Sequence, residues 1–153
     1  REANRIHCKK TRDRRREKER DLSQEVELLK LYESIVEEGP DLFSLHEPSV
    51  DAPFLYQCKN FLTRLQLAPE QTRGHSLCSI VDPRDACLLR NAISEVLNQA
   101  QQQANLVAIS SGAGSSGSLV RVHVIHGATF REASMSIVVG SRGLVVVTRL
   151  YDS

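Results

Sequence analysis

The spacing of apolar residues divides the chain into segments of different character. Residues 1–38 contain neither glycine nor proline and are rich in Arg, Lys, Glu and Leu, and the run ends at Gly39-Pro40. These are good helix formers followed by a strong stop, so we predict one long helix. It would extend for ~57 Å at 1.5 Å per residue. Its first half has no apolar face, so we expect it to become ordered on a partner.

The second half of this helix carries two apolar stripes. Leu22, Leu29 and Val36 recur every seven residues, with Val26 between the first two, which is typical of the seam of a coiled coil. Facing Glu33 side chains would repel in a homodimer, so the zipper is weak or selects its partner. A second stripe at i, i+3, i+4, i+7 spacing is expected to be covered by the domain that follows. Its members are Leu28, Leu31, Tyr32 and Ile35.

From residue 41 the pattern is mixed. Residues 41–47 and 54–59 are typical of short strands, residues 60–67 of a short helix, and Pro69 begins another turn. Residues 81–104 form a clear amphipathic helix, with Asp82 or Asp85 expected as the N-cap. Its predicted inward face consists of Leu88, Leu89, Ile93, Val96 and Leu97.

The last third of the chain is rich in strand patterns. Residues 110–118 are small and polar, which indicates a flexible loop, and they lack the lysine and following helix of a phosphate-binding loop. Residues 119–125, 130–139 and 143–151 then read as three strands separated by Gly127 and by the turn 140–143. We therefore predict an α+β fold, with a five-stranded antiparallel sheet covered by helices on one face.

Charge is concentrated at the beginning of the chain. Residues 1–20 hold ten Lys/Arg and four Asp/Glu, a net of 10 − 4 = +6, whereas the remaining residues hold ten and fifteen, a net of 10 − 15 = −5. A cationic segment of this kind favours a polyanionic partner. The chain begins with Arg1, already inside this segment, so we expect it to be a fragment of a longer protein.

Other features exclude several classes. No apolar run is long enough for a membrane span, and no signal peptide is evident. The four cysteines show neither CxxC spacing nor a paired framework, which favours free thiols in a reducing compartment. No set of nucleophile, base and acid is spaced for catalysis, so we predict no enzyme, no metal site and no cofactor.

Uncharged side chains within the basic segment follow a helical spacing. At i, i+3, i+4, i+7, i+8 they form one stripe whose amide, imidazole, thiol, hydroxyl and guanidinium groups suit base edges in the major groove. The cations beside this stripe can reach phosphates. The predicted base-reading set is Asn4, His7, Cys8, Thr11 and Arg12, and the predicted phosphate set is Arg5, Lys9, Lys10, Arg14, Arg15 and Arg16.

This arrangement resembles the basic leucine zipper (bZIP) family. The family signature is Asn-x-x-Ala-Ala-x-x-Ser/Cys-Arg, followed ten residues later by the first zipper leucine. Asn4, Arg12 and Leu22 match it, whereas His7 and Cys8 stand where the family has two alanines, so the target sequence is open. The resemblance implies a basic DNA-binding helix at 1–21, a short zipper at 22–38, and a dimer seam formed by Leu22, Val26, Leu29 and Val36.

Two other interpretations of the basic segment stay open. It could be a solvated single helix without a ligand, or the basic part of a helix-loop-helix protein. The latter design needs a second amphipathic helix, whereas Gly39-Pro40 leads into strand-like sequence. Cys8 could be a redox-sensitive thiol beside cations, or simply a small side chain that fits against DNA. His7 could bond a guanine or only touch a phosphate.

Residues 41–153 resemble a PAS domain. The order of two strands, short helices, a long helix and three strands is that of the family, and Val81-Asp82-Pro83-Arg84-Asp85 matches its hydrophobic-x-Pro-x-Asp turn. The resemblance implies a sensory or dimerisation domain. The flavin-binding subtype is disfavoured because Cys78 lies one residue late. Haem is disfavoured because the long helix carries no histidine, and we expect Cys58, Cys78 and Cys87 to fill the core.

Together these features predict a dimeric, sequence-specific regulator of transcription that acts in the nucleus. Its expected partners are double-stranded DNA and either a second copy or another bZIP protein, and it should not bind a membrane. Whether the PAS domain takes a small-molecule ligand is left open. The alternative is a PAS-type sensory or protein-interaction module whose basic arm binds nucleic acid nonspecifically.

Overall fold

The chain consists of two compact units, which we describe separately. The computed structural model describes the backbone of residues 2–106 and 117–151, and the side chains of residues 8–105 and 117–151. The first unit, residues 1–35, is called the arm, and the second, residues 36–153, is called the sheet domain. Within the described ranges, no helix combines the length and the apolar character that a membrane span requires.

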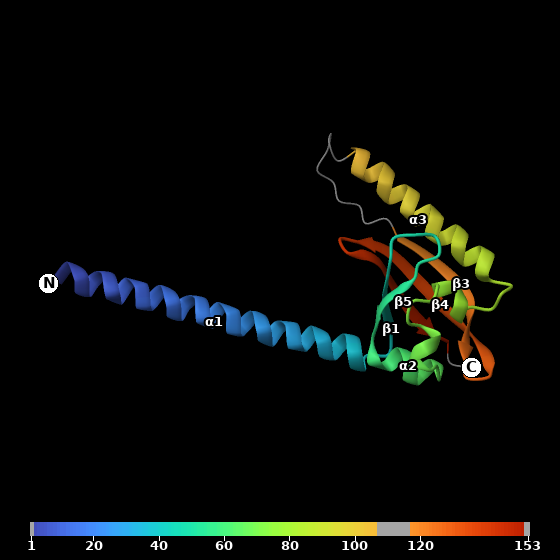
Figure 1. Ribbon diagram of the computed structural model, residues 1–153, viewed down its shortest axis with the longest axis horizontal. Helices are drawn as coiled ribbons and strands as arrows, with labels where there is room; N and C mark the ends of the chain where they lie inside the picture. Colours follow the sequence, from blue (N-terminus) through green and yellow to red (C-terminus); the bar gives the residue numbers. More distant parts are fainter. Residues whose placement is uncertain (1, 107–116, 152–153) are drawn as a thin grey trace. The chain divides into compact units, whose positions relative to one another are not determined.

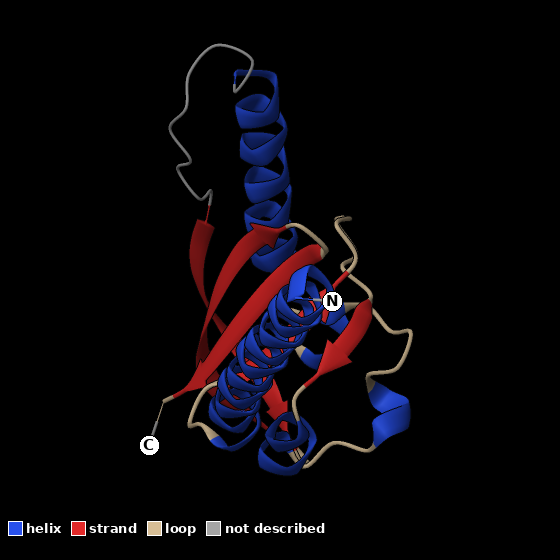
Figure 2. Cartoon of the chain, turned by 90° about the vertical axis from the view of Figure 1, so that its left-hand side faces the viewer, coloured by secondary structure: helices blue, strands red, loops and turns tan. Residues whose placement is uncertain are grey.

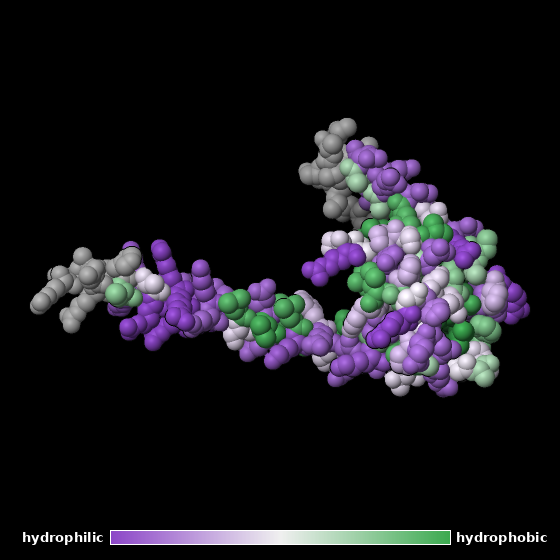
Figure 3. Space-filling model, in the orientation of Figure 1, coloured by the Kyte–Doolittle hydropathy of each residue, from purple (hydrophilic) through white to green (hydrophobic). Residues whose placement is uncertain are grey.

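Helix α1 (Glu2–Glu38) forms the whole arm and continues into the first residues of the sheet domain. The long helix predicted from the absence of glycine and proline is therefore confirmed (Figure 1). Every described side chain of the arm is exposed. Figure 3 shows a hydrophilic stretch of α1 followed by an apolar patch. Exposed apolar side chains in this number are typical of a helix face that packs against another surface.

Five strands form one antiparallel sheet in the order β2-β1-β5-β4-β3, as Figure 2 shows in red. Two of them precede the long helix of the domain and three follow it, so the predicted sheet is confirmed. The strands are β1 (Leu42–His46), β2 (Phe54–Gln57), β3 (Gly117–His126), β4 (Thr129–Gly140) and β5 (Gly143–Leu150).

The helices of the sheet domain lie between β2 and β3 in the chain. They are α2 (Lys59–Leu65), the 3-10 helices η1 (Pro69–Gln71) and η2 (Leu77–Ile80), and α3 (Ala86–Leu106). The amphipathic pattern predicted α3, whereas no helix was predicted at the position of η2. Most of the polar loop predicted at residues 110–118 lies outside the described residues, and Gly117 and Ser118 belong to β3.

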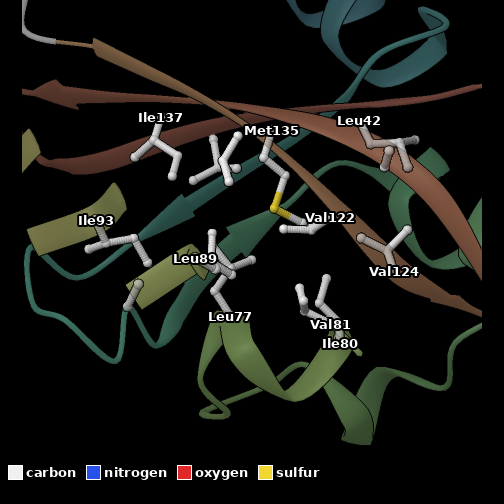
Figure 4. Close-up of a cluster of buried hydrophobic side chains, with 14 of the residues drawn as sticks. Leu42, Leu77, Ile80, Val81, Leu89, Ile93, Val122, Val124, Met135 and Ile137 are labelled. Atoms are coloured by element: carbon white, nitrogen blue, oxygen red, sulfur yellow. The ribbon is translucent and has the colours of Figure 1, made fainter. Parts of the chain in front are cut away.

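One core joins these helices to one face of the sheet. Leu77, Ile80, Leu89 and Ile93 from the helical side point toward Met135 and its neighbours on the strands (Figure 4). Side chains alternate between the two faces of a strand, so the buried strand positions define an inner face. On β3, β4 and β5 its buried apolar members are Val120, Val122, Val124, Ala133, Met135, Ile137, Leu144, Val146 and Leu150.

The hairpin between β4 and β5 depends on Gly143. Its φ is +144°, a backbone conformation that side-chain-bearing residues rarely adopt, and an added Cβ would lie 2.2 Å from the backbone oxygen of His46. Glycine is therefore required where β5 begins beside the end of β1. This confirms the turn that was predicted at residues 140–143.

Three details of the sequence interpretation need correction. Leu88 was expected to face inward but is 51% exposed, because the buried stripe of α3 runs through Leu89, Ile93 and Val96. Cys87 was expected to fill the core but is exposed, whereas Cys58 is buried as expected. Asp85 lies at the predicted N-cap position, since its carbonyl accepts from the backbone N–H of Leu89, but its carboxylate bonds strand β3 and not the first turn of α3.

Candidate functional site

The described part of the predicted base-reading set shares one face of the arm. Cys8, Thr11 and Arg12 line a shallow groove together with Arg15. Their side chains are exposed and they follow one another at helical spacing. Asn4 and His7 lie within α1, but their side chains are outside the described residues. The arrangement offers a thiol, a hydroxyl and guanidinium groups to a ligand in a major groove.

Among the described members of the phosphate set, Arg15 lies on this same face, and Arg16 is exposed like the others. Lys9, Lys10 and Arg14 are exposed, and the side chain of Arg5 lies outside the described residues. Arg15 forms an ion pair with Glu19, with 3.1 Å between Nε and Oε1 and both side chains more than half exposed. An exposed pair of this spacing contributes only about 0.3–0.5 kcal/mol. A phosphate could therefore replace Glu19 as the partner of Arg15 at little cost.

The predicted dimer seam is exposed along the arm but not at its end. Leu22, Val26 and Leu29 are 60%, 48% and 58% exposed. Val36 differs because it is partly buried and packs against the core of the sheet domain. Since that packing already covers part of Val36, the seam available to a second copy is centred on the other three residues. The second stripe, Leu28, Leu31, Tyr32 and Ile35, is also exposed within the helix. That the following domain covers this stripe stays a prediction.

The outer face of the sheet is a second apolar surface. Strand register places Leu45 beside Val145 and Val145 beside Val138, and it places Phe43 beside Val147. Leu45, Val138, Val145 and Val147 alternate with the buried inner-face residues, so they project from the side opposite the core cluster, whereas Phe43 also packs against that cluster. All five are partly exposed. One row of three apolar side chains thus crosses β1, β5 and β4, and a second row of two joins β1 and β5.

A polar network fastens the start of α3 to strand β3. The Asp85 carboxylate accepts hydrogen bonds from the backbone N–H of His123 at 2.8 Å and from His123 Nδ1 at 2.9 Å. The backbone N–H of Asp82 donates to the His123 carbonyl at 2.8 Å. The hydrogen bonds from His123 hold the pKa of Asp85 below its ordinary value. Hydrogen bonds that the side chain and backbone of Arg84 donate to the Asp82 carboxylate lower the pKa of Asp82 to about 2. The network fixes the Val81–Asp85 turn.

A histidine is buried at the end of β1. One ring nitrogen of His46, Nδ1, lies 2.8 Å from the Ala52 carbonyl, and the other, Nε2, lies 2.8 Å from the Ser44 hydroxyl. The carbonyl can only accept, so Nδ1 carries the proton and Nε2 accepts from Ser44. Burial lowers the pKa of His46 to about 4, although the bond to Ala52 opposes this. The ring is therefore neutral near pH 7 and has a structural role.

Thr148 is the one described residue with a buried side-chain oxygen that lacks a hydrogen-bond partner. We expect Thr148→Val to stabilise the domain by about 1 kcal/mol, since a methyl group of similar shape removes an unpaired buried hydroxyl. Urea unfolding of both proteins measures this difference. Thr72→Val is the control, because the buried Thr72 hydroxyl donates to the Pro69 carbonyl and accepts from Gln57. Stabilisation by both substitutions, or by neither, would contradict the assignment.

The last turn of α1 makes polar contacts within the sheet domain that the sequence did not suggest. Glu37 is buried, and its carboxylate accepts hydrogen bonds from the Tyr56 hydroxyl and from the backbone N–H of Lys59. Burial raises the pKa of Glu37, but these two bonds outweigh it and the pKa lies below its ordinary value. The only feature of the sequence that could have indicated these contacts is the position of Glu37 in the last turn of a helix, where cations are usually favoured over carboxylates.

The described residues offer no site of the metalloenzyme type. No three His, Cys, Asp or Glu side chains among them gather closely enough to hold a metal ion. The space between the helices and the sheet is occupied by large buried side chains, including Phe61, Leu77, Ile93 and Met135.

Comparison with solved structures identifies the fold. The PAS domain of an HTR-like protein from Haloarcula marismortui is 12% identical, with a TM-score of 0.59, over 87% of this chain and 99% of its own. A PAS domain from Colwellia psychrerythraea is 15% identical, with a TM-score of 0.56, over 81% of this chain and 97% of its own. The PAS domain of the Cronobacter turicensis quorum-sensing receptor RpfR, in complex with BDSF, is 8% identical, with a TM-score of 0.55. The match covers 74% of this chain and 96% of that domain.

The sheet domain has a PAS fold. The fold predicted from the element order and from the Val81–Asp85 turn is thus confirmed. No protein-family model and no curated protein matches the sequence. Identities this low show the fold alone, so the bZIP resemblance of the arm stays a prediction. In the PAS domain, the outer face of the sheet and the end of α1 are the features that could connect it to a partner.

Proposed function

We propose that the chain is a dimeric regulator of transcription, in which the arms bind double-stranded DNA and the PAS domain holds two copies together. The observation that carries the proposal is the exposed face of the arm formed by Cys8, Thr11, Arg12 and Arg15, within a helix that continues into an exposed apolar repeat. A helix of this kind fits the major groove, and its apolar repeat fits a second helix. Such a role implies a nuclear location and requires no catalysis.

Two copies would bring two arms to adjacent half-sites. The seam formed by Leu22, Val26 and Leu29 is short, and facing Glu33 side chains would weaken it. Pairing through a second surface would compensate for this weakness. The outer face of the PAS sheet supplies one, since its apolar rows are only partly covered within a single copy. We therefore assign the PAS domain to pairing.

A PAS-type interaction module with a nonspecific arm is the second candidate. It is favoured by the PAS fold, which supports an interaction or sensory role without any requirement for base recognition. Selection of bound duplexes from a random pool distinguishes the two candidates. Recovery of a shared motif supports the specific regulator. A bound pool without any shared motif would leave the nonspecific module as the better description.

Pairing through the sheet can be tested at one position. We expect Val147→Glu to raise the dimer dissociation constant by at least about tenfold, because a carboxylate within the apolar rows would be desolvated on pairing. Analytical ultracentrifugation measures the constant, and circular dichroism checks that the domain remains folded. Val50→Glu is the matched control, since Val50 is 43% exposed and lies between β1 and β2 rather than on the sheet.

The two variants introduce the same charge into the same domain. Equal dimer dissociation constants for both would exclude the outer face as the pairing surface. Pairing would then depend on the arm alone.

A further inference from the structure

The last turn of α1 and the two residues that follow it are bonded to helix α2. The first N–H groups of a helix have no partner inside the helix, and a side chain of the N-cap residue usually accepts from them. In α2 the N-cap residue is Cys58, whose side chain makes no such bond. Glu37 takes its place, because its Oε2 accepts from the backbone N–H of Lys59 at 2.5 Å.

Two side chains of α2 also donate hydrogen bonds to the residues that directly follow α1. The Asn60 side chain donates to the Gly39 carbonyl at 3.4 Å, and the Arg64 guanidinium donates to the Pro40 carbonyl. Both carbonyls follow the end of α1 at Glu38, so these bonds hold the chain just after the helix. We call the contacts of residues 36–40 with α2 and with Tyr56 of β2 the joint. All of its members belong to the PAS domain.

The charge of Glu37 is poorly placed for its own helix and well placed for α2. The last turn of α1 contains no basic residue, and a carboxylate there opposes the negative end of the helix dipole. The same carboxylate lies at the N-terminal end of α2, where a negative charge is favourable. The end of α1 therefore gains stability from the joint and from the packing of Val36, and not from a favourable charge of its own.

We propose that Glu37 is the positioning residue through which the PAS domain fixes the end of the arm helix. While the joint is closed, the last turn of α1 is held by Tyr56 and Lys59 of the PAS domain. When it opens, that turn loses its outside partners and frays, and the arm is no longer joined to the domain by an ordered helix. The effect of the joint on DNA binding rests on the proposed function, whereas the existence of the joint depends only on the contacts of Glu37.

The test compares Glu37→Gln with Glu38→Gln in the full chain. Both remove one negative charge from adjacent residues, so they change the long-range attraction to DNA equally, but only Glu37 caps α2. We expect amide hydrogen exchange at Lys59 and in residues 35–38 to become roughly tenfold faster in Glu37→Gln, since a hydrogen bond to a charged acceptor is replaced by a neutral one. Glu38→Gln should leave the exchange rate at Lys59 unchanged, and the Val146 amide should stay protected in both.

A second readout connects the joint to function. Affinity for a duplex should fall severalfold in Glu37→Gln compared with Glu38→Gln, because frayed arms bind as a less ordered pair. Exchange rates that do not differ between the variants would overturn the joint. If exchange is faster in Glu37→Gln but both variants bind the duplex equally well, the joint exists but does not control the arm. If neither variant nor the parent chain binds any duplex, the proposed function fails while the exchange result still decides the joint.

Discussion

Replacing Asn4 or Arg12 with alanine is expected to abolish the preference of the chain for one duplex, whereas replacing Lys9 should weaken all duplexes alike. Asn4 and Arg12 belong to the predicted base-reading stripe, and loss of a side chain that bonds a base edge costs about 1–3 kcal/mol on the cognate sequence only. A lysine that contacts phosphate contributes to every sequence. The measurement is the ratio of dissociation constants for a selected duplex and a scrambled one, at one fixed salt concentration.

Lys9→Ala is the control because Lys9 is an exposed neighbour on the same helix. It should weaken binding without changing the ratio, and it should reduce the salt dependence by about one counterion. The same uniform loss in all three variants would exclude base recognition by this stripe. Salt dependence alone cannot distinguish the candidates, since both modes of binding release counterions.

The fold of the PAS domain could be predicted from the sequence because its strands and long helix have strong, regular patterns. Alternation of apolar residues identified β3 and β5, and the spacing of Leu89, Ile93 and Val96 identified α3. Leu88 shows the limit of this approach. It belongs to the same apolar run, but only contact with the sheet decides which side of a wide stripe is buried, and Leu88 lies outside it.

The polar contacts could not be predicted, because each joins residues that are distant in the chain. The Asp85 carboxylate bonds His123, 38 residues later, and Glu37 bonds Lys59, 22 residues later. Local rules suggested that Asp85 caps its own helix, since a carboxylate before a helix usually does so. In the folded chain the β3 backbone competes for that carboxylate, and tertiary structure decides the outcome.

The candidate site divides in the same way. Helical periodicity alone was enough to group Cys8, Thr11 and Arg12, and the structure places these three side chains along one groove. The apolar outer face needed the strand register, which brings Leu45, Val145 and Val138 into one row from three strands. Sequence patterns within one element predict faces of that element, whereas surfaces built from several elements require their order and register.

Acidification should destabilise the PAS domain strongly between pH values of about 6.5 and 4, because His46 must remain neutral when folded. In the unfolded chain the pKa of histidine is about 6.5, whereas burial lowers the pKa of folded His46 to about 4. The unfolded chain therefore binds the extra proton first, and stability that is fully present above about pH 6.5 is lost as the pH falls toward 4. The difference between the two pKa values corresponds to about 3 kcal/mol.

Replacing His46 with a residue that does not titrate isolates this contribution. His46→Gln should lower stability near pH 7, since it disturbs the bonds to Ala52 and Ser44. It should also remove most of the decline in the free energy of unfolding between about pH 7 and about pH 4.5. Urea unfolding at several pH values measures that slope, and the exposed His75, replaced in the same way, is the control. If the slope of His46→Gln equals that of the parent chain, protonation of another group causes the acid sensitivity, and the buried ring contributes packing and hydrogen bonds alone.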